Sequence, residues 1–184
     1  MRNDNPIWPF VDQKAVDFTG LADRVFDTPE LAYDEVKSCA AHTQMLREQG
    51  FRVTRNVAGI PTAVMGEAGE GWPVIAILGE YDALPGLSQE PGLAQPRQIA
   101  DHGFGHGCGH NLLGSAALSA ATAVKDWLES EGIAGRVRYY GCPAEEGGAA
   151  KTYMVREGQF DDVDIAITWH PASFNAVDDM RWLA

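Results

Sequence analysis

The run from Val74 to Leu78 is apolar at every position, and it constrains the fold more than any other segment. A strand with one face in water alternates apolar and polar residues, so an unbroken apolar run indicates a strand covered on both faces. Helices must then lie on both sides of a sheet. The chain has 184 residues, of which 45% are hydrophobic, and this is enough for one domain with a substantial core.

Helix and strand patterns alternate along the rest of the chain, which predicts an α/β fold. Apolar stripes predict helices at Asp12–Asp27, Asp34–Gln49, about Leu112–Leu128 with a stop at Gly132, and Gly148–Glu157. Strands are predicted at Phe51–Val57, Thr62–Gly66, Pro73–Tyr81, Arg136–Cys142 and Val163–Trp169. The stretch Asp82–Gly109 has no periodicity, and a loop of this length is uncommon unless it serves function.

Composition and charge disfavour several kinds of partner. The chain carries 14 Lys and Arg against 26 Asp and Glu, a net charge of -12 that disfavours nucleic acid and anionic lipid. No apolar stretch reaches the roughly 20 residues of a membrane span. The first ten residues lack the pattern of a secretion signal, and three cysteines do not make a disulfide framework, so we expect a cytoplasmic protein.

A dense group of metal-ligand side chains lies at the end of the long loop. His102, His106, Cys108 and His110 are separated by glycines, and imidazole and thiolate are the best side-chain ligands for zinc and similar ions. The spacing fits neither a Cys₂His₂ finger nor a phosphate-binding loop. A flexible Gly/His loop with a buried cysteine remains the alternative.

Three further polar positions follow predicted strands. Asp82, the pair Glu145 and Glu146, and His170 each stand at the end of one, and in open α/β sheets sites form outside the carboxyl ends of the strands. Two adjacent carboxylates repel each other, which raises the pKa of one of them unless a cation lies between them. Two exposed acids at the start of a helix, where negative charge is favoured, would explain the pair equally well. Together, metal ligands, a carboxylate base and a supporting acid are what hydrolysis of an unactivated bond requires.

Four ordered motifs resemble a known family. GEYDALP (Gly79–Pro85), GCGHN (Gly107–Asn111), PAEEGG (Pro143–Gly148) and His170-Pro171 are similar to those of the metallo-amidohydrolases that include aminoacylases, hippurate hydrolases and auxin-conjugate hydrolases. The segment Thr28–Leu31 matches the family's early Pro-Glu-Leu signature. Asn111 stands where many relatives carry Asp, and this resembles the p-aminobenzoyl-glutamate branch of the family.

The resemblance implies a three-layer αβα aminopeptidase-like catalytic domain with two divalent ions, of zinc, manganese or cobalt. By the family pattern, Cys108 bridges both ions as a thiolate, His110 and His170 complete one of them, and Glu146 binds the second. Glu145 is the general base and later the acid, and Asp82 supports His110. The histidines at 102 and 106 and the cysteine at 142 match no ligand position.

The resemblance also sets expectations about domains and partners. Relatives continue into an inserted dimerisation domain and then return to complete the catalytic domain and the second metal site. We therefore expect residues 1–184 to be the N-terminal part of the catalytic domain, with an open sheet edge, and to hold one ion or none. The full-length protein is expected to dimerise, with itself or with a related subunit.

The expected activity is hydrolysis of an amide bond in an N-acyl or aminoacyl amino acid, such as a p-aminobenzoyl-glutamate-like or dipeptide-like substrate. A non-catalytic metal-binding partner subunit, or an inactive fragment, remains an alternative that predicts metal binding without turnover. A cysteine hydrolase built on Cys108 is a third hypothesis, but it leaves the two adjacent glutamates unexplained.

Overall fold

The computed structural model describes residues 3–99 and 103–173. His102, which we expect to be a loop residue outside the ligand set, lies outside the described residues.

A mixed sheet in the order β1-β2-β4-β3-β5 forms the centre of the described fold. Its strands are β1 (Arg52–Arg55), β2 (Val64–Glu70), β3 (Val74–Glu80), β4 (Gly135–Cys142) and β5 (Ile165–Ile167). β3 runs parallel to β4 and β5, whereas β2 runs antiparallel to β1 and β4. The carboxyl ends of β3, β4 and β5 therefore lie at one edge of the sheet.

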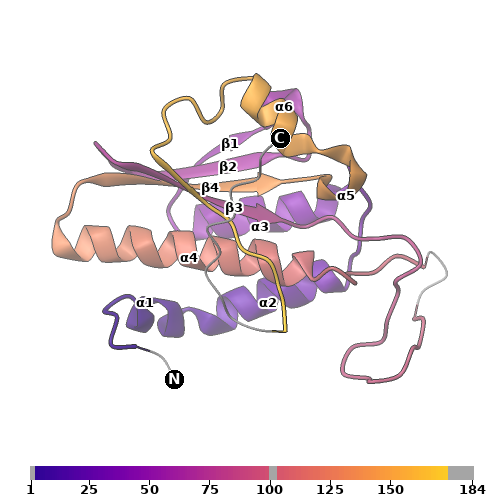
Figure 1. The fold of residues 1–184 in the computed structure, drawn as a ribbon. Coiled ribbons are helices and arrows are strands. Elements are labelled where there is room, and N and C mark those ends of the chain that lie inside the picture. The colour runs from indigo at the N-terminus through magenta and orange to yellow at the C-terminus, as the bar shows by residue number, and fades with distance from the viewer. Residues whose placement is uncertain (1–2, 100–102, 174–184) are drawn as a thin grey trace.

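Helices cover both faces of this sheet (Figure 1). They are α1 (Trp8–Gln13), α2 (Ala15–Phe26), α3 (Val36–Glu48), α4 (His110–Glu131), α5 (Glu145–Gly148) and α6 (Ala150–Arg156), with a 3₁₀ turn, η1, at Val57–Gly59. α3 and α4 pack on one face with α2 beneath them, and α6 lies on the other. The three layers agree with the sequence prediction of a covered sheet.

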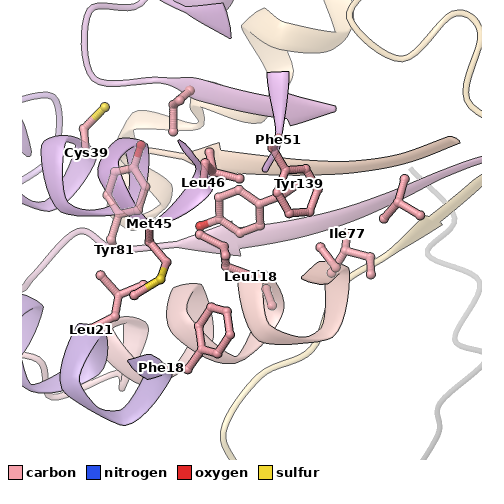
Figure 2. Packing of buried hydrophobic residues seen from close by; sticks show 14 of the residues in the cluster. Phe18, Leu21, Cys39, Met45, Leu46, Phe51, Ile77, Tyr81, Leu118 and Tyr139 are labelled. Carbon is pink, nitrogen blue, oxygen red and sulfur yellow. The ribbon is translucent and has the colours of Figure 1, made fainter. Parts of the chain in front are cut away.

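The central strand β3 contributes to two separate cores. Ile75 and Ile77 face the larger core, which α2, α3 and α4 complete, and Figure 2 shows Leu46, Leu118 and Tyr139 meeting there. Ala76 and Leu78 point to the other face, where Met154 of α6 packs. Each fully buried large side chain contributes about 1.5–3 kcal/mol to stability, so the unbroken apolar run is explained by burial on both faces.

Some element boundaries differ from the sequence prediction. The helix predicted from Asp12 is divided at Lys14, whose ammonium group reaches Asp126 of α4 and the side chain of Gln49, each at 2.7 Å. The helix predicted from Gly148 starts at Ala150, because Ala149 has a left-handed backbone with φ 50°. β2 extends to Glu70 because β4 pairs with it along its whole length.

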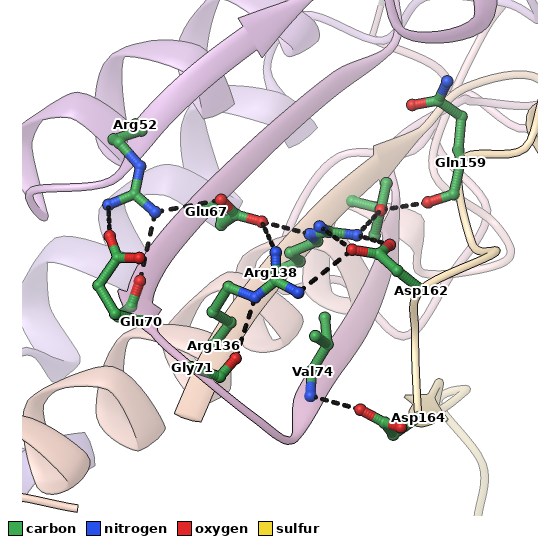
Figure 3. A network of polar contacts seen from close by, with 12 residues as sticks. Arg52, Glu67, Glu70, Gly71, Val74, Arg136, Arg138, Gln159, Asp162 and Asp164 are labelled. Carbon is green, nitrogen blue, oxygen red and sulfur yellow. Dashed lines mark hydrogen bonds and ion pairs between the residues drawn. The ribbon is translucent and has the colours of Figure 1, made fainter. Parts of the chain in front are cut away.

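A polar network fixes the chain between α6 and β5 (Figure 3). The Arg138 guanidinium on β4 donates to both carboxylate oxygens of Asp162, at 2.6 and 2.8 Å, and to Glu67 on β2 at 2.5 Å. Asp164 accepts the backbone N–H of Val74 at 2.8 Å. These contacts hold the segment that leads into β5. Within the described residues, none of the helices has the length and apolarity required to cross a bilayer.

Candidate metal centre

Four chain regions meet at the carboxyl edge of the parallel strands. Asp82 follows β3, the turn bearing Glu145 and Glu146 follows β4, and His170 follows β5. His110 is the first residue of α4, whose N-terminal end packs against the end of β3. The convergence predicted from strand ends is therefore present, although no sequence pattern could show which atoms face one another.

Asp82 and His110 lie at the buried bottom of the site. The Nδ1 nitrogen of His110 lies 3.0 Å from a carboxylate oxygen of Asp82, and the other oxygen accepts the backbone N–H of Glu146 at 2.8 Å. Burial alone raises the pKa of Asp82, but the hydrogen bonds from His110 and Glu146 outweigh it and hold that pKa below its ordinary value. Because a carboxylate only accepts, the Nδ1 atom carries the proton.

This tautomer leaves the Nε2 nitrogen of His110 with a lone pair. Nε2 is buried and has no hydrogen-bond partner among the described residues, yet it lies 3.1 Å from a carboxylate oxygen of Glu80. The carboxylates of Glu145 and Glu146 are 3.9 and 4.0 Å away from the same nitrogen. Lone pairs facing one another in a buried site repel unless a cation, a proton or a metal ion, lies between them.

The surrounding acids also favour a positive charge on His110, because they raise its pKa. Burial lowers that pKa, but the nearby carboxylates of Asp82, Glu80 and Glu146 raise it above the ordinary histidine value. The carboxylate of Glu80 is also paired with the Lys151 ammonium group. The site therefore favours positive charge at Nε2.

Cys108 and His170 complete a group of candidate ligands. The Cys108 sulfur lies 3.1 Å from Nε2 of His170, although the two residues are 62 positions apart. Ligand atoms of Cys108, His110 and His170 all lie within 4.8 Å of one another, and so do those of Glu80, His110 and Glu145. Burial, then the neighbouring Glu146 and Glu145 carboxylates, raise the pKa of the Cys108 thiol to about 11. A thiolate here requires a cation beside it.

Three further sulfur and imidazole groups of the described residues do not belong to these groups of candidate ligands. Cys39 is buried in the larger core, as its helical stripe predicted, and Cys142 is buried at the end of β4. A ring nitrogen of His106 contacts the carbonyl of Val25 at 3.1 Å, so His106 packs against α2.

Two residues of the site, Glu80 and Lys151, received no role from the sequence. Glu80 and Asp82 are two positions apart at the end of β3, and alternate residues of a strand share a face, so the signal for Glu80 was present. Lys151 lies in the first turn of α6 and reaches Glu80 from there. No local pattern links Lys151 to β3.

Residues 76–178 match the model of peptidase family M20/M25/M40, and the chain belongs to this family. It is 56% identical to a subunit of the p-aminobenzoyl-glutamate hydrolase of Escherichia coli K12 over 167 residues, 91% of this chain and 35% of that protein. It is 33% identical to the N-acetyl-L-cysteine deacetylase of Bacillus subtilis 168 over 153 residues, 82% of this chain and 35% of that protein.

Solved structures agree with the fold. A dinuclear metal-binding peptidase of the M20 family from Bacillus subtilis superposes with a TM-score of 0.69 at 25% identity, covering 86% of this chain and 42% of that one. The resemblance to the metallo-amidohydrolase family and the three-layer fold are thereby confirmed. The chain spans about a third of the length of the curated relatives it matches.

Proposed function

We propose that the protein containing these residues is a metal-dependent amidohydrolase that cleaves the amide bond of an N-acyl or aminoacyl amino acid. The observation that carries the proposal is the buried Nε2 nitrogen of His110, which faces carboxylates without a hydrogen-bond partner in the described part of the chain. Soft and borderline donors from Cys108 and His170 lie beside it. This donor set fits a divalent transition-metal ion.

The proposed ligands are those that the family pattern implies. Cys108, His110 and His170 hold one ion, and Cys108 with Glu146 supplies donors for a second. A divalent ion in such a site lowers the pKa of bound water and polarises a carbonyl group. The dinuclear relative supports two ions in the whole protein, while the donors suit zinc, manganese or cobalt.

The chain's own residues divide the remaining work. Glu145 is the more exposed member of the pair, with 43% of its side chain accessible against 28% for Glu146. Its carboxylate takes the proton from the attacking water and returns it to the leaving amine nitrogen. Asp82 holds the Nδ1 proton of His110, which keeps Nε2 available as a ligand.

The names of the relatives support the substrate class. One belongs to a p-aminobenzoyl-glutamate hydrolase and another is an N-acetyl-L-cysteine deacetylase, and both substrates are amino acids acylated on nitrogen. We propose p-aminobenzoyl-glutamate or a related amide as the substrate. The first relative is named as one subunit of its enzyme, which supports assembly with a second chain.

The first test is metal content by mass spectrometry on the purified chain after loading with zinc or manganese. We expect about one bound ion per chain and none in Cys108→Ala, because the thiolate is the ligand that joins the donors. The control is Cys39→Ala, which removes a thiol from the core and should keep the ion. Equal metal content in all three proteins would remove the basis for the assignment.

Hydrolysis is then assayed with metal saturated, on the chain alone and together with the remaining part of the Escherichia coli relative. Turnover that disappears in Glu145→Gln with metal content unchanged supports the enzyme. Metal binding without turnover in either assembly would instead support a non-catalytic metal-binding subunit.

A further inference from the structure

The early Thr28–Leu31 motif has no part in the chemistry described so far, yet its chain segment reaches the site. It belongs to the connection between α2 and α3, which contacts the chain just after β3 and just after β4. The Glu30 carbonyl accepts the backbone N–H of Ala83 at 2.8 Å, directly after Asp82. The Glu30 carboxylate accepts the backbone N–H groups of Lys37 and Ser38 at 2.9 to 3.0 Å. Glu30 therefore ties the start of α3 to the end of β3.

The turn that carries the two glutamates needs support from outside itself. Ala144 before the pair has φ 52°, and Ala149 after it has φ 50°, a left-handed backbone that costs a residue with a Cβ atom about 1 kcal/mol or more. Glu146 itself departs from helical geometry, with ψ 83°. Such a turn persists only where neighbouring structure holds it.

Two residues of the connection hold the ends of this turn. A single carboxylate oxygen of the buried Glu35 accepts the backbone N–H of Ala144 at 2.7 Å and that of Tyr33 at 3.0 Å. The hydroxyl of Tyr33 donates to the carbonyl of Gly148 at 2.6 Å. These contacts span 109 and 115 positions of sequence, and they grip the turn on both sides of the glutamates.

The packing around Gly148 makes the grip tight. A Cβ atom on Gly148 would lie 2.6 Å from the Cβ atom of Ala144 and 2.9 Å from a ring carbon of Tyr33. Asp82 holds the middle of the same turn through the backbone N–H of Glu146. The turn is thus held at its start, middle and end by three different side chains.

We infer that Tyr33 and Glu35 are positioning residues, which hold the turn so that the Glu145 and Glu146 carboxylates face Nε2 of His110. This inference rests on the proposed function, because it assigns the two residues to the metal site. Neither side chain lies within the groups of candidate ligands found among the described residues. They act through the backbone of the turn.

The test compares hydroxyl and carboxylate deletions with matched controls. Tyr33→Phe removes the bond to Gly148, and Tyr140→Phe removes an equally short 2.6 Å bond from a tyrosine hydroxyl to the carbonyl of Gln159, away from the site. Glu35→Ala removes the acceptor for Ala144, whereas Glu35→Gln keeps an acceptor oxygen of the same shape. Zinc affinity is measured by competition with a chromophoric chelator, and stability by thermal unfolding.

We expect Tyr33→Phe and Glu35→Ala to weaken zinc binding by about tenfold or more, the range found for groups that orient ligands. Glu35→Gln should restore most of the affinity. Tyr140→Phe should lower the melting temperature and leave the affinity unchanged. Equal affinity in the parent, Tyr33→Phe and Glu35→Ala overturns the inference.

Hydrogen–deuterium exchange of the backbone amides from 144 to 149 separates this inference from the proposed function. Faster exchange in Tyr33→Phe than in Tyr140→Phe shows that the hydroxyl holds the turn, whether or not metal is bound. Unchanged exchange overturns the inference. A parent chain that binds no zinc overturns both the proposed function and the assignment of Tyr33 and Glu35 to a metal site, even where the exchange rates change.

Discussion

Replacing Asp82 with Asn changes one atom of a buried carboxylate, and the structure specifies what that atom does. One oxygen accepts Nδ1–H of His110 at 3.0 Å, and the other accepts the backbone N–H of Glu146 at 2.8 Å. An amide can satisfy only one of these donors with its oxygen. Its NH₂ group must face the other.

Both orientations of the amide damage the site. With NH₂ toward Glu146, two N–H groups face each other in a buried position, which costs about 1–3 kcal/mol. With NH₂ toward His110, Nδ1 must become the acceptor, so the proton moves to Nε2. That nitrogen, which faces the carboxylate of Glu80, then has no lone pair for an ion.

The expected result is a loss of about 10–100-fold in metal affinity, equivalent to about 1.4–2.8 kcal/mol. Titration calorimetry with zinc measures it, and urea unfolding of the metal-free protein measures the change in stability. Asp126→Asn is the control. Asp126 lies in α4, as His110 does, but its carboxylate pairs with Lys14, away from the site. An Asp82→Asn protein that binds zinc as tightly as Asp126→Asn would refute the reasoning.

Two further predictions concern the packing beneath the site. Burial lowers the pKa of His42 to about 3, whereas a histidine in the unfolded chain has a pKa of about 6.5. The free energy of unfolding is therefore highest above about pH 6.5. It decreases as the pH falls toward 3, because the unfolded chain binds a proton that the folded chain does not. Urea unfolding should show about 2 kcal/mol of this loss between pH 7 and pH 5, and an equally steep pH dependence in His42→Gln would contradict it. A Cβ atom on Gly114 would lie 2.3 Å from the carbonyl oxygen of Glu80, so Gly114→Ala should push α4 away from β3, destabilise the fold by about 1–3 kcal/mol and weaken zinc binding through His110. Gly20→Ala in α2 meets only ordinary contacts and should stabilise the fold by about 0.5–1 kcal/mol, and urea unfolding that ranks the two alanines the other way would contradict the argument.

Much of the layer structure was predictable because it depends on local patterns. The apolar stripe of α4 and the apolar run of β3 record which faces are buried, and burial on one or both faces leaves a period in the sequence. The predicted element boundaries were wrong where contacts between distant residues determine the backbone conformation. Lys14 interrupts the first predicted helix at the point where it reaches Asp126, which lies in a different helix.

The candidate site shows the same division. Sequence order placed Asp82, Glu145 and His170 at strand ends, and parallel pairing brings those ends to one edge. The role of each atom was not available from order alone. The hydrogen bond from Nδ1 of His110 to Asp82 selects a tautomer, and this selection exists only once the two chain regions are in contact.

The amino-acid sequence by itself therefore determined the class of fold, most of the candidate ligands and the edge of the sheet at which they gather. The tertiary structure alone decided that Nε2 of His110 faces Glu80, that Lys151 pairs with that acid, and that Tyr33 and Glu35 grip the turn after β4. The physical reason is that burial leaves a periodic trace along the chain, whereas contacts across a hundred residues depend on the path of the folded backbone.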